Sequence, residues 1–259
     1  MAKSNKRRDE ERRSAAAARV AQLQRAQQAA ERRRRALIVS AVAVAVIVAA
    51  VGGFLIYQAS KGTTKTVAAS GVGGSTTNYG FVVGDAAASA TMVVYEDFQC
   101  PACKLFEDTN GKTVQQYITD GKLKVEYRPI AFLDRQSSTE YSTRSLNAAA
   151  CVTDSTDTRT FKTFHDLLYA NQPVEGSAGL TDDQLVTYAK QAGAASPAVA
   201  TCIKDQTFKD WAGTATETAS KEGVAATPTV QLDGSDVAGS TWGKADAFKA
   251  ALDEAVAKG

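Results

Sequence analysis

The alternation of apolar and polar residues predicts strands and helices from about residue 79 onward. TMVVYEDF, residues 91–98, is a short β-rich run typical of a central strand. Pro101 stands where a helix begins, and apolar positions then recur at helical spacing as far as Gly121. KLKVEYRPI, residues 122–130, alternates and predicts a second strand. The short connections favour a β-α-β unit with a parallel pair of strands.

The pattern becomes helical after the second strand. We expect helices near residues 137–152, 158–171, 181–193 and 207–221. TPTVQLDGSDVAG, residues 227–239, resembles a β-hairpin that turns at Asp233–Gly234, and residues 244–259 predict an amphipathic helix. The predicted fold class is therefore α/β. A β-α-β half and a β-β-α half form a thioredoxin-like fold over residues 79–259, with an inserted helical subdomain at about 136–222.

The N-terminal part follows a different pattern, a basic tail and then an apolar run. Residues 1–35 hold twelve Lys or Arg against four acids, whereas the whole chain has a net charge of only +2. Residues 36–57 carry no charge, and at about 1.5 Å per residue they are long enough to cross a hydrocarbon core of roughly 30 Å. They predict a single transmembrane helix that acts as an uncleaved signal-anchor. A cleaved signal peptide stays open as the alternative, because small residues follow at Ala59–Ser60.

Charge and composition predict the topology. By the positive-inside rule, Arg32–Arg35 keep the N-terminus in the cytoplasm, so the chain is expected to be a single-pass protein of the cell membrane with its folded domain extracytoplasmic. Residues 58–78 are rich in Gly, Ser and Thr and predict a flexible linker. We expect no nucleic-acid partner, because the basic tail has no aromatic residues to stack on bases.

FQCPACK, residues 98–104, places two cysteines two residues apart directly after the first strand. A zinc site would need four ligands, but Cys151 and Cys202 stand singly and the chain has one histidine, His165. Exported cysteines also lie in an oxidising compartment. The spacing and the strand-then-helix context therefore favour a redox pair and no metal.

The start of the helix predicts different roles for the two sulfurs. With Cys100 at the N-cap and Pro101 at the first helical position, the Cys100 sulfur faces free backbone N–H groups and the positive end of the helix dipole. These favour the thiolate, which is the attacking species in disulfide exchange. We predict Cys100 as the exposed, reactive cysteine with a lowered pKa, and Cys103 as the resolving cysteine.

Three segments, YEDFQCPAC, FHDLLYANQP (residues 164–173) and ATPTV (residues 226–230), together resemble the DsbA-like thiol-disulfide oxidoreductases in their membrane-anchored bacterial form. The resemblance implies a cis peptide bond between Thr227 and Pro228, which places the Thr227 backbone beside Cys100 to pair with an extended substrate segment. It implies exported client proteins with free cysteines, a quinone-linked membrane partner that reoxidises the pair, and no cofactor. The Pro–Ala dipeptide between the cysteines lacks the histidine of the most oxidising members.

Further residues have a functional and a structural interpretation. Outside the cell, Cys151 and Cys202 are expected to form a structural disulfide, the alternative being an electron relay to the active pair. Glu96 is the candidate to accept the proton of Cys103, because strand alternation puts it on the face of Met92 and Val94; the alternative for Glu96 and its neighbour Asp97 is a solvated strand end. We interpret His165 as structural.

The leading prediction is an enzyme that forms disulfides in exported proteins through Cys100 and Cys103. One alternative is a disulfide reductase or isomerase. Another, of a different class, is a peptide-binding chaperone module in which the two cysteines form a purely structural disulfide.

Overall fold

The structure is a computed structural model and describes residues 72–259. The predicted basic tail at 1–35, the predicted transmembrane helix at 36–57 and most of the predicted linker at 58–78 lie outside the described residues. Within the described range, no helix combines the length and the apolar character that a membrane span requires.

The strands of the described chain form one sheet in the order β1-β3-β2-β4-β5. Their bounds are Phe81–Val83 for β1, Ala90–Glu96 for β2, Leu123–Pro129 for β3, Thr229–Leu232 for β4 and Ser235–Asp236 for β5. Strands β2 and β3 are parallel, with Met92 opposite Val125, and the other neighbouring pairs are antiparallel. The predicted β-α-β unit and the hairpin at Asp233–Gly234 are confirmed. Strand β2 lies at the centre of the sheet and ends at the cysteine motif.

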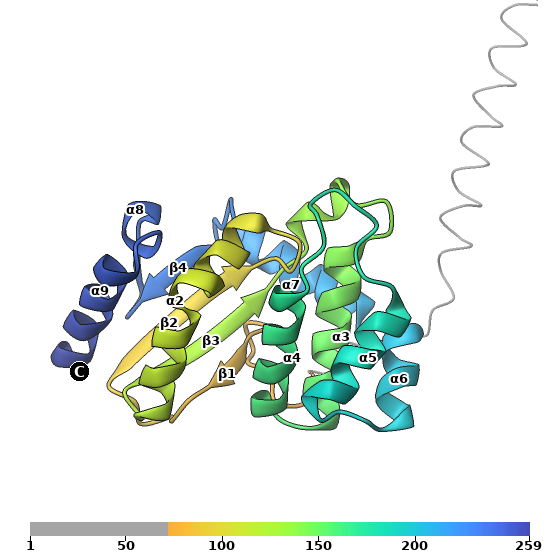
Figure 1. Ribbon diagram of the computed structural model, residues 1–259, viewed down its shortest axis with the longest axis horizontal. Helices are drawn as coiled ribbons and strands as arrows, with labels where there is room; N and C mark the ends of the chain where they lie inside the picture. Colours follow the sequence, from red (N-terminus) through yellow and green to blue (C-terminus); the bar gives the residue numbers. More distant parts are fainter. Residues whose placement is uncertain (1–71) are drawn as a thin grey trace, which may run out of the picture. The chain divides into compact units, whose positions relative to one another are not determined.

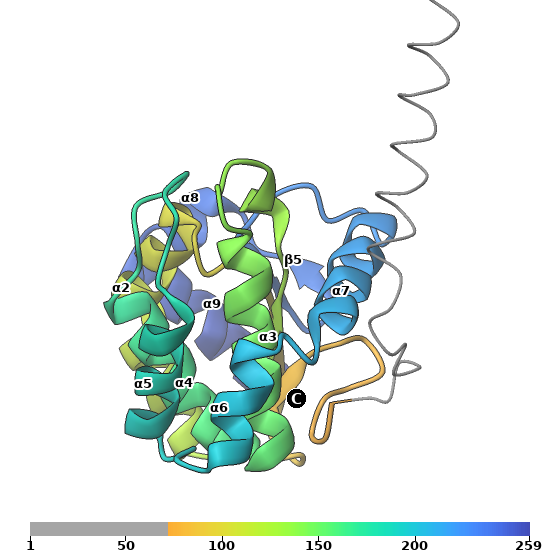
Figure 2. The same ribbon diagram turned by 90° about the vertical axis from the view of Figure 1, so that its right-hand side faces the viewer.

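Helices lie on both sides of the sheet (Figure 2). The bounds are Pro101–Thr119 for α2, Phe132–Arg135 for the 3-10 helix η1, Tyr141–Ser155 for α3, Thr158–Ala170 for α4, Asp182–Ala192 for α5, Pro197–Lys204 for α6, Lys209–Lys221 for α7, Gly239–Trp242 for α8 and Ala245–Lys258 for α9. Helices α2 and α9 pack on each other and on β3 and β2, whereas α7 packs on β3 and on α3. Figure 2 shows α2 and α7 on opposite sides of the sheet.

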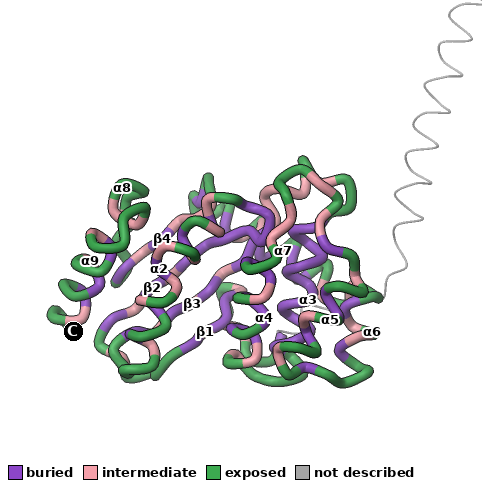
Figure 3. The backbone as a smooth tube through the Cα atoms, viewed as in Figure 1, coloured by how far each residue is buried: buried purple, intermediate pink, exposed green. Residues whose placement is uncertain are grey.

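Helices α3 to α7 form the predicted helical insertion between β3 and β4. Figure 1 shows α3, α4, α5 and α6 gathered beside one end of the sheet. Helix α3 is the core of this block, because residues 141–153 are all buried (Figure 3). A disulfide joins Cys151 of α3 to Cys202 of α6, with their Cα atoms 5.9 Å apart. The predicted α/β fold with an inserted helical subdomain is confirmed.

The domain begins earlier than the predicted linker boundary at residue 78. Val72 is buried, the backbone N–H of Gly73 donates a hydrogen bond to Asp154 at 2.8 Å, and Ser75 forms a β-bridge with Phe81. The last residues of the predicted linker therefore pack on the domain, although the composition of the segment is typical of a linker. Strand β1 and helices α6 and α8 were not predicted, because each is too short to show a clear hydrophobic period.

Candidate active site

The cysteine motif lies where β2 passes into α2. Cys100 is the N-cap of α2, with an extended backbone (φ −79°, ψ 118°), and Pro101 occupies the first turn, as predicted. The N–H of Cys100 donates to the Asp97 carbonyl at 2.9 Å, and the N–H of Cys103 donates to the Cys100 carbonyl at 3.1 Å. The first helical turn therefore places the two sulfurs side by side above the end of the central strand.

Cys100 has a lowered pKa. The thiol of Cys103 donates a hydrogen bond that favours the Cys100 thiolate, and so do the Thr227 side chain and the backbone N–H groups of Cys103 and Ala102. Against the effect of partial burial, these donors lower the pKa of Cys100 to about 6. When protonated, the sulfur donates to the Thr227 carbonyl at 3.3 Å. The Thr227–Pro228 peptide bond beside it is cis.

The exposure of the two cysteines differs less than the sequence suggested. Cys100 is 8% exposed and Cys103 is 1% exposed, so Cys100 is not the openly exposed sulfur that we predicted. The Thr227 loop covers Cys100, which the helix start alone could not reveal. Burial, the hydrogen bond to Cys100 and the charges of Cys100 and Glu96 raise the pKa of Cys103 well above its ordinary value. At neutral pH the pair therefore consists of one thiolate and one thiol.

Glu96 lies buried at the end of β2. It is 1% exposed, so the interpretation as a solvated strand end does not hold. Its Oε2 atom lies 3.1 Å from Nε2 of His165 and accepts a hydrogen bond from the Tyr169 hydroxyl at 3.3 Å. Tyr169 also donates to the Asp97 carbonyl at 3.3 Å. Helix α4 of the insertion therefore supplies the polar partners of this carboxylate.

Asp97 holds the turn that carries the cysteines. Its carboxylate accepts hydrogen bonds from the N–H of Gln99 at 2.9 Å, the N–H of Leu133 at 2.9 Å and the hydroxyl of Ser142 at 2.6 Å. Burial raises the pKa of Asp97 to about 6, although the three donors favour its charged form. Asp97 therefore connects the active-site turn to η1 and α3.

The segment between α4 and α5 supports the same turn. The side-chain amide of Gln172 donates to the Cys100 carbonyl at 2.9 Å, and that of Gln99 donates to the Ser177 carbonyl at 3.1 Å. The sequence marked this segment only as a loop, so Gln172 was not predicted as a site residue, and Gln99 was not singled out within the cysteine motif.

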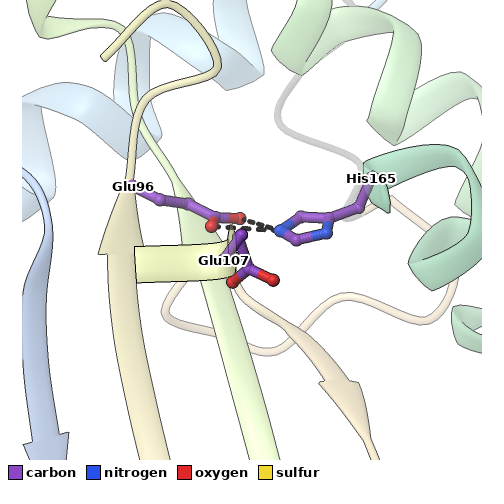
Figure 4. A group of neighbouring side chains, drawn as sticks. All are labelled: Glu96, Glu107 and His165. Carbon is purple, nitrogen blue, oxygen red and sulfur yellow. Dashed lines mark hydrogen bonds and ion pairs between the residues drawn. The ribbon is translucent and has the colours of Figure 1, made fainter. Parts of the chain in front are cut away.

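His165 joins the carboxylates beneath the cysteines. It is fully buried, and its Nε2 atom lies 3.0 Å from Oε1 of Glu96 (Figure 4). Its other ring nitrogen, Nδ1, lies 3.0 Å from Oδ1 of Asp166. Burial lowers the pKa of His165, but the charge of Glu96 and the hydrogen bonds to both carboxylates outweigh it and raise the pKa to about 10. Our interpretation of His165 as a structural residue missed this charged contact.

Glu107 of α2 lies close to Glu96 and His165, and burial raises the pKa of Glu107 to about 7. It stands four residues after Cys103, so both lie on the same face of the helix. This spacing is the signal by which the sequence could have indicated Glu107.

The comparisons with known proteins agree with this geometry. A family model described as Thioredoxin matches residues 76–254. The oxidised crystal structure of Mtb DsbA is 30% identical, covering 68% of this chain and 92% of that chain with a TM-score of 0.59. The reduced disulfide bond oxidoreductase DsbG of Mycobacterium tuberculosis is 30% identical, covering 71% and 86%, with a TM-score of 0.58. MdbA, a thiol-disulfide oxidoreductase of Corynebacterium diphtheriae, is 26% identical, covering 71% and 92%, with a TM-score of 0.59.

A curated relative matches over a shorter range. The serine/threonine-protein kinase PknE of Mycobacterium tuberculosis is 32% identical over 130 residues, which are 49% of this chain and 23% of the kinase. The chain therefore spans less than a quarter of this relative.

The chain belongs to the thioredoxin family, and within it to the DsbA-like thiol-disulfide oxidoreductases. It is an enzyme of thiol-disulfide exchange.

The donors around Cys100 predict the pH dependence of its alkylation. Because its pKa is lowered to about 6, the reaction rate of the reduced protein with iodoacetamide should rise with pH, reach half of its maximum near pH 6 and then level off, whereas a free thiol would reach half of its maximum only at about pH 8.5. Replacing Cys103 with Ala removes the first donor and should shift the profile to higher pH. Cys103→Ser keeps a donor and should shift it less. Identical profiles for the parent and the Ala variant would show that Cys103 does not stabilise the thiolate.

Proposed function

We propose that this protein is a membrane-anchored, extracytoplasmic oxidase that forms disulfides in exported proteins. The observation that carries the proposal is the contrast between the two sulfurs: the pKa of Cys100 is lowered and that of Cys103 is raised. A purely structural disulfide does not require such a difference, whereas a catalytic pair needs one attacking sulfur and one that resolves.

The proposed reaction follows from this division. A client thiolate attacks Sγ of Cys100 in the oxidised enzyme, the Cys100–Cys103 bond breaks, and Cys103 leaves as a thiolate that takes up a proton. A second client thiolate then attacks the client sulfur of the mixed disulfide and releases Cys100 as a thiolate. The client is oxidised by two electrons, and the enzyme is left reduced.

Three further residues take part in the proposed reaction. Glu96, buried beneath the pair, gives a proton to Cys103 during client oxidation and accepts it when the pair is reoxidised. The Thr227 backbone pairs with the extended client segment, and Pro228 keeps that backbone beside Cys100. The contact of Cys100 with the Thr227 carbonyl supports this placement.

The proposed partners are exported client proteins with free cysteines and a quinone-linked membrane protein that reoxidises the pair. No bound cofactor is required, because electrons pass from sulfur to sulfur. The proposed location rests on the apolar run at 36–57, on the basic tail before it, and on the Cys151–Cys202 disulfide, since such bonds persist in oxidising compartments.

Trapping of clients tests the roles of the two cysteines. In the Cys103→Ser variant the resolving sulfur is missing, so mixed disulfides with client proteins should accumulate at Cys100 and be visible on non-reducing gels. Cys100→Ser, the matched control with the same substitution, should trap none. Equal trapping by both variants would contradict the assignment of Cys100 as the attacking sulfur.

Topology is tested separately. A reporter that is active only outside the cytoplasm, fused after Gly259, should be active in the parent, and replacing Arg32–Arg35 with neutral residues should reduce its activity. If a second reporter, active only in the cytoplasm and fused at the same position, were active in the parent, the proposed location would be refuted.

A further inference from the structure

Three side chains with metal-binding atoms meet beneath the redox pair. Glu96 comes from the end of β2, Glu107 from α2 and His165 from α4, and one ligand atom of each lies within 4.8 Å of the others (Figure 4). The redox reaction proceeds at the two sulfurs and leaves Glu107 without a role. This group is also separate from the cysteines, which were the zinc ligands considered from the sequence.

Two carboxylate oxygens in this group are buried without a hydrogen-bond donor, Oε1 of Glu96 and Oε1 of Glu107. The Glu96 side chain is 1% exposed, and its Oε1 atom lies 3.0 Å from Nε2 of His165 but outside hydrogen-bond geometry. The ion pair with His165 compensates Oε1 of Glu96, whereas Oε1 of Glu107 has no hydrogen-bond partner. A buried carboxylate oxygen without a hydrogen bond is costly unless a water or an ion binds it. Both oxygens belong to side chains whose ligand atoms lie near the imidazole.

His165 is held in the orientation of a metal ligand. Its Nδ1 atom lies 3.0 Å from Oδ1 of Asp166, which leaves Nε2 facing the two glutamates. Metal-binding histidines commonly donate their other ring N–H to a carboxylate, which fixes the tautomer and the direction of the ring. Asp166 is itself half-exposed and paired with Lys162.

The charges around the group favour a divalent cation. Glu96, Glu107 and Asp166 are three carboxylates, and Lys162 is the one basic side chain among their ion-pair partners in the described structure besides His165. A metal ion at Nε2 must displace the proton that His165 carries in its ion pair with Glu96. With His165 neutral, the three carboxylates and Lys162 leave two net negative charges. A pocket of about 420 Å³, lined by Glu107, Lys162, Asp166 and Tyr169 among others, lies beside the group on the side of Glu107.

We propose that Glu96, Glu107 and His165 bind a divalent transition-metal ion. One imidazole and two carboxylates are donors that suit Zn²⁺, and three protein ligands leave a fourth position open. The contact of Asp166 with Nδ1 of His165 orients the ring.

Zinc titration of the oxidised, untagged, full-length protein tests this site. In the oxidised protein all four cysteines are in disulfides, and the chain has one histidine, so no other thiolate or imidazole competes. Calorimetry should show one saturable zinc ion per chain. Glu107→Gln should weaken binding at least about tenfold, and Asp166→Asn, which removes the partner of the imidazole, by about tenfold or more.

Asp108→Asn is the matched control, because it removes one negative charge from the neighbouring exposed position of the same helix. It should bind zinc as the parent does. His165→Gln should abolish binding, and if that variant does not fold, Glu107→Gln decides, since its side chain is only half-buried. Absence of saturable binding to the parent, or equal affinities of Glu107→Gln and Asp108→Asn, would overturn the proposal.

Discussion

Stabilisation of one thiolate at the start of α2 is the interaction on which the chemistry of this protein depends. Four donors converge on Cys100: the Cys103 thiol, the Thr227 side chain and two backbone N–H groups of the first helical turn. The central strand leads into the motif, Pro101 begins the helix that supplies the N–H groups, and the Thr227 loop contacts the Cys100 sulfur. A stabilised thiolate favours the reduced form of the pair, and the corresponding disulfide is a stronger oxidant.

The helical insertion contributes to the active site as well as to the core. Ser142 of α3 donates to Asp97, and His165 and Tyr169 of α4 contact Glu96. Two carboxylates can therefore lie buried under the cysteines, because the insertion supplies donors that a sheet with only α2 and α9 would lack. Breaking one of these contacts would leave a charge without a partner inside the protein, which is far costlier than losing a surface hydrogen bond.

Local sequence signals predicted most of the secondary-structure elements and the position of Cys100 at the start of a helix, whereas the contacts around the two cysteines depend on residues far away in the sequence. Pro101, directly after Cys100, indicates the start of a helix because proline is favoured at the first helical position. Strand alternation correctly put Glu96 on the buried face. The cover of the Thr227 loop over Cys100 joins residues 127 positions apart, and nothing near the motif encodes it. The apolar run around His165 shows that this residue is buried, but it does not show whether the imidazole packs only against aromatic rings or also contacts Glu96 of β2. Val72 and Gly73 fall within the predicted linker, but Val72 is buried in the domain and Gly73 donates a hydrogen bond to Asp154 of α3.

The central claim is that thiolate stabilisation makes this pair an oxidant of client thiols. The most direct test is the reduction potential of the Cys100–Cys103 pair in the full-length protein, measured by equilibration with a dithiol of known potential. Because the donors favour the thiolate but the Pro–Ala dipeptide adds no histidine, we expect a value between that of thioredoxin, about −270 mV, and that of DsbA, about −120 mV. A value at or below that of thioredoxin would contradict the account and favour a reductase.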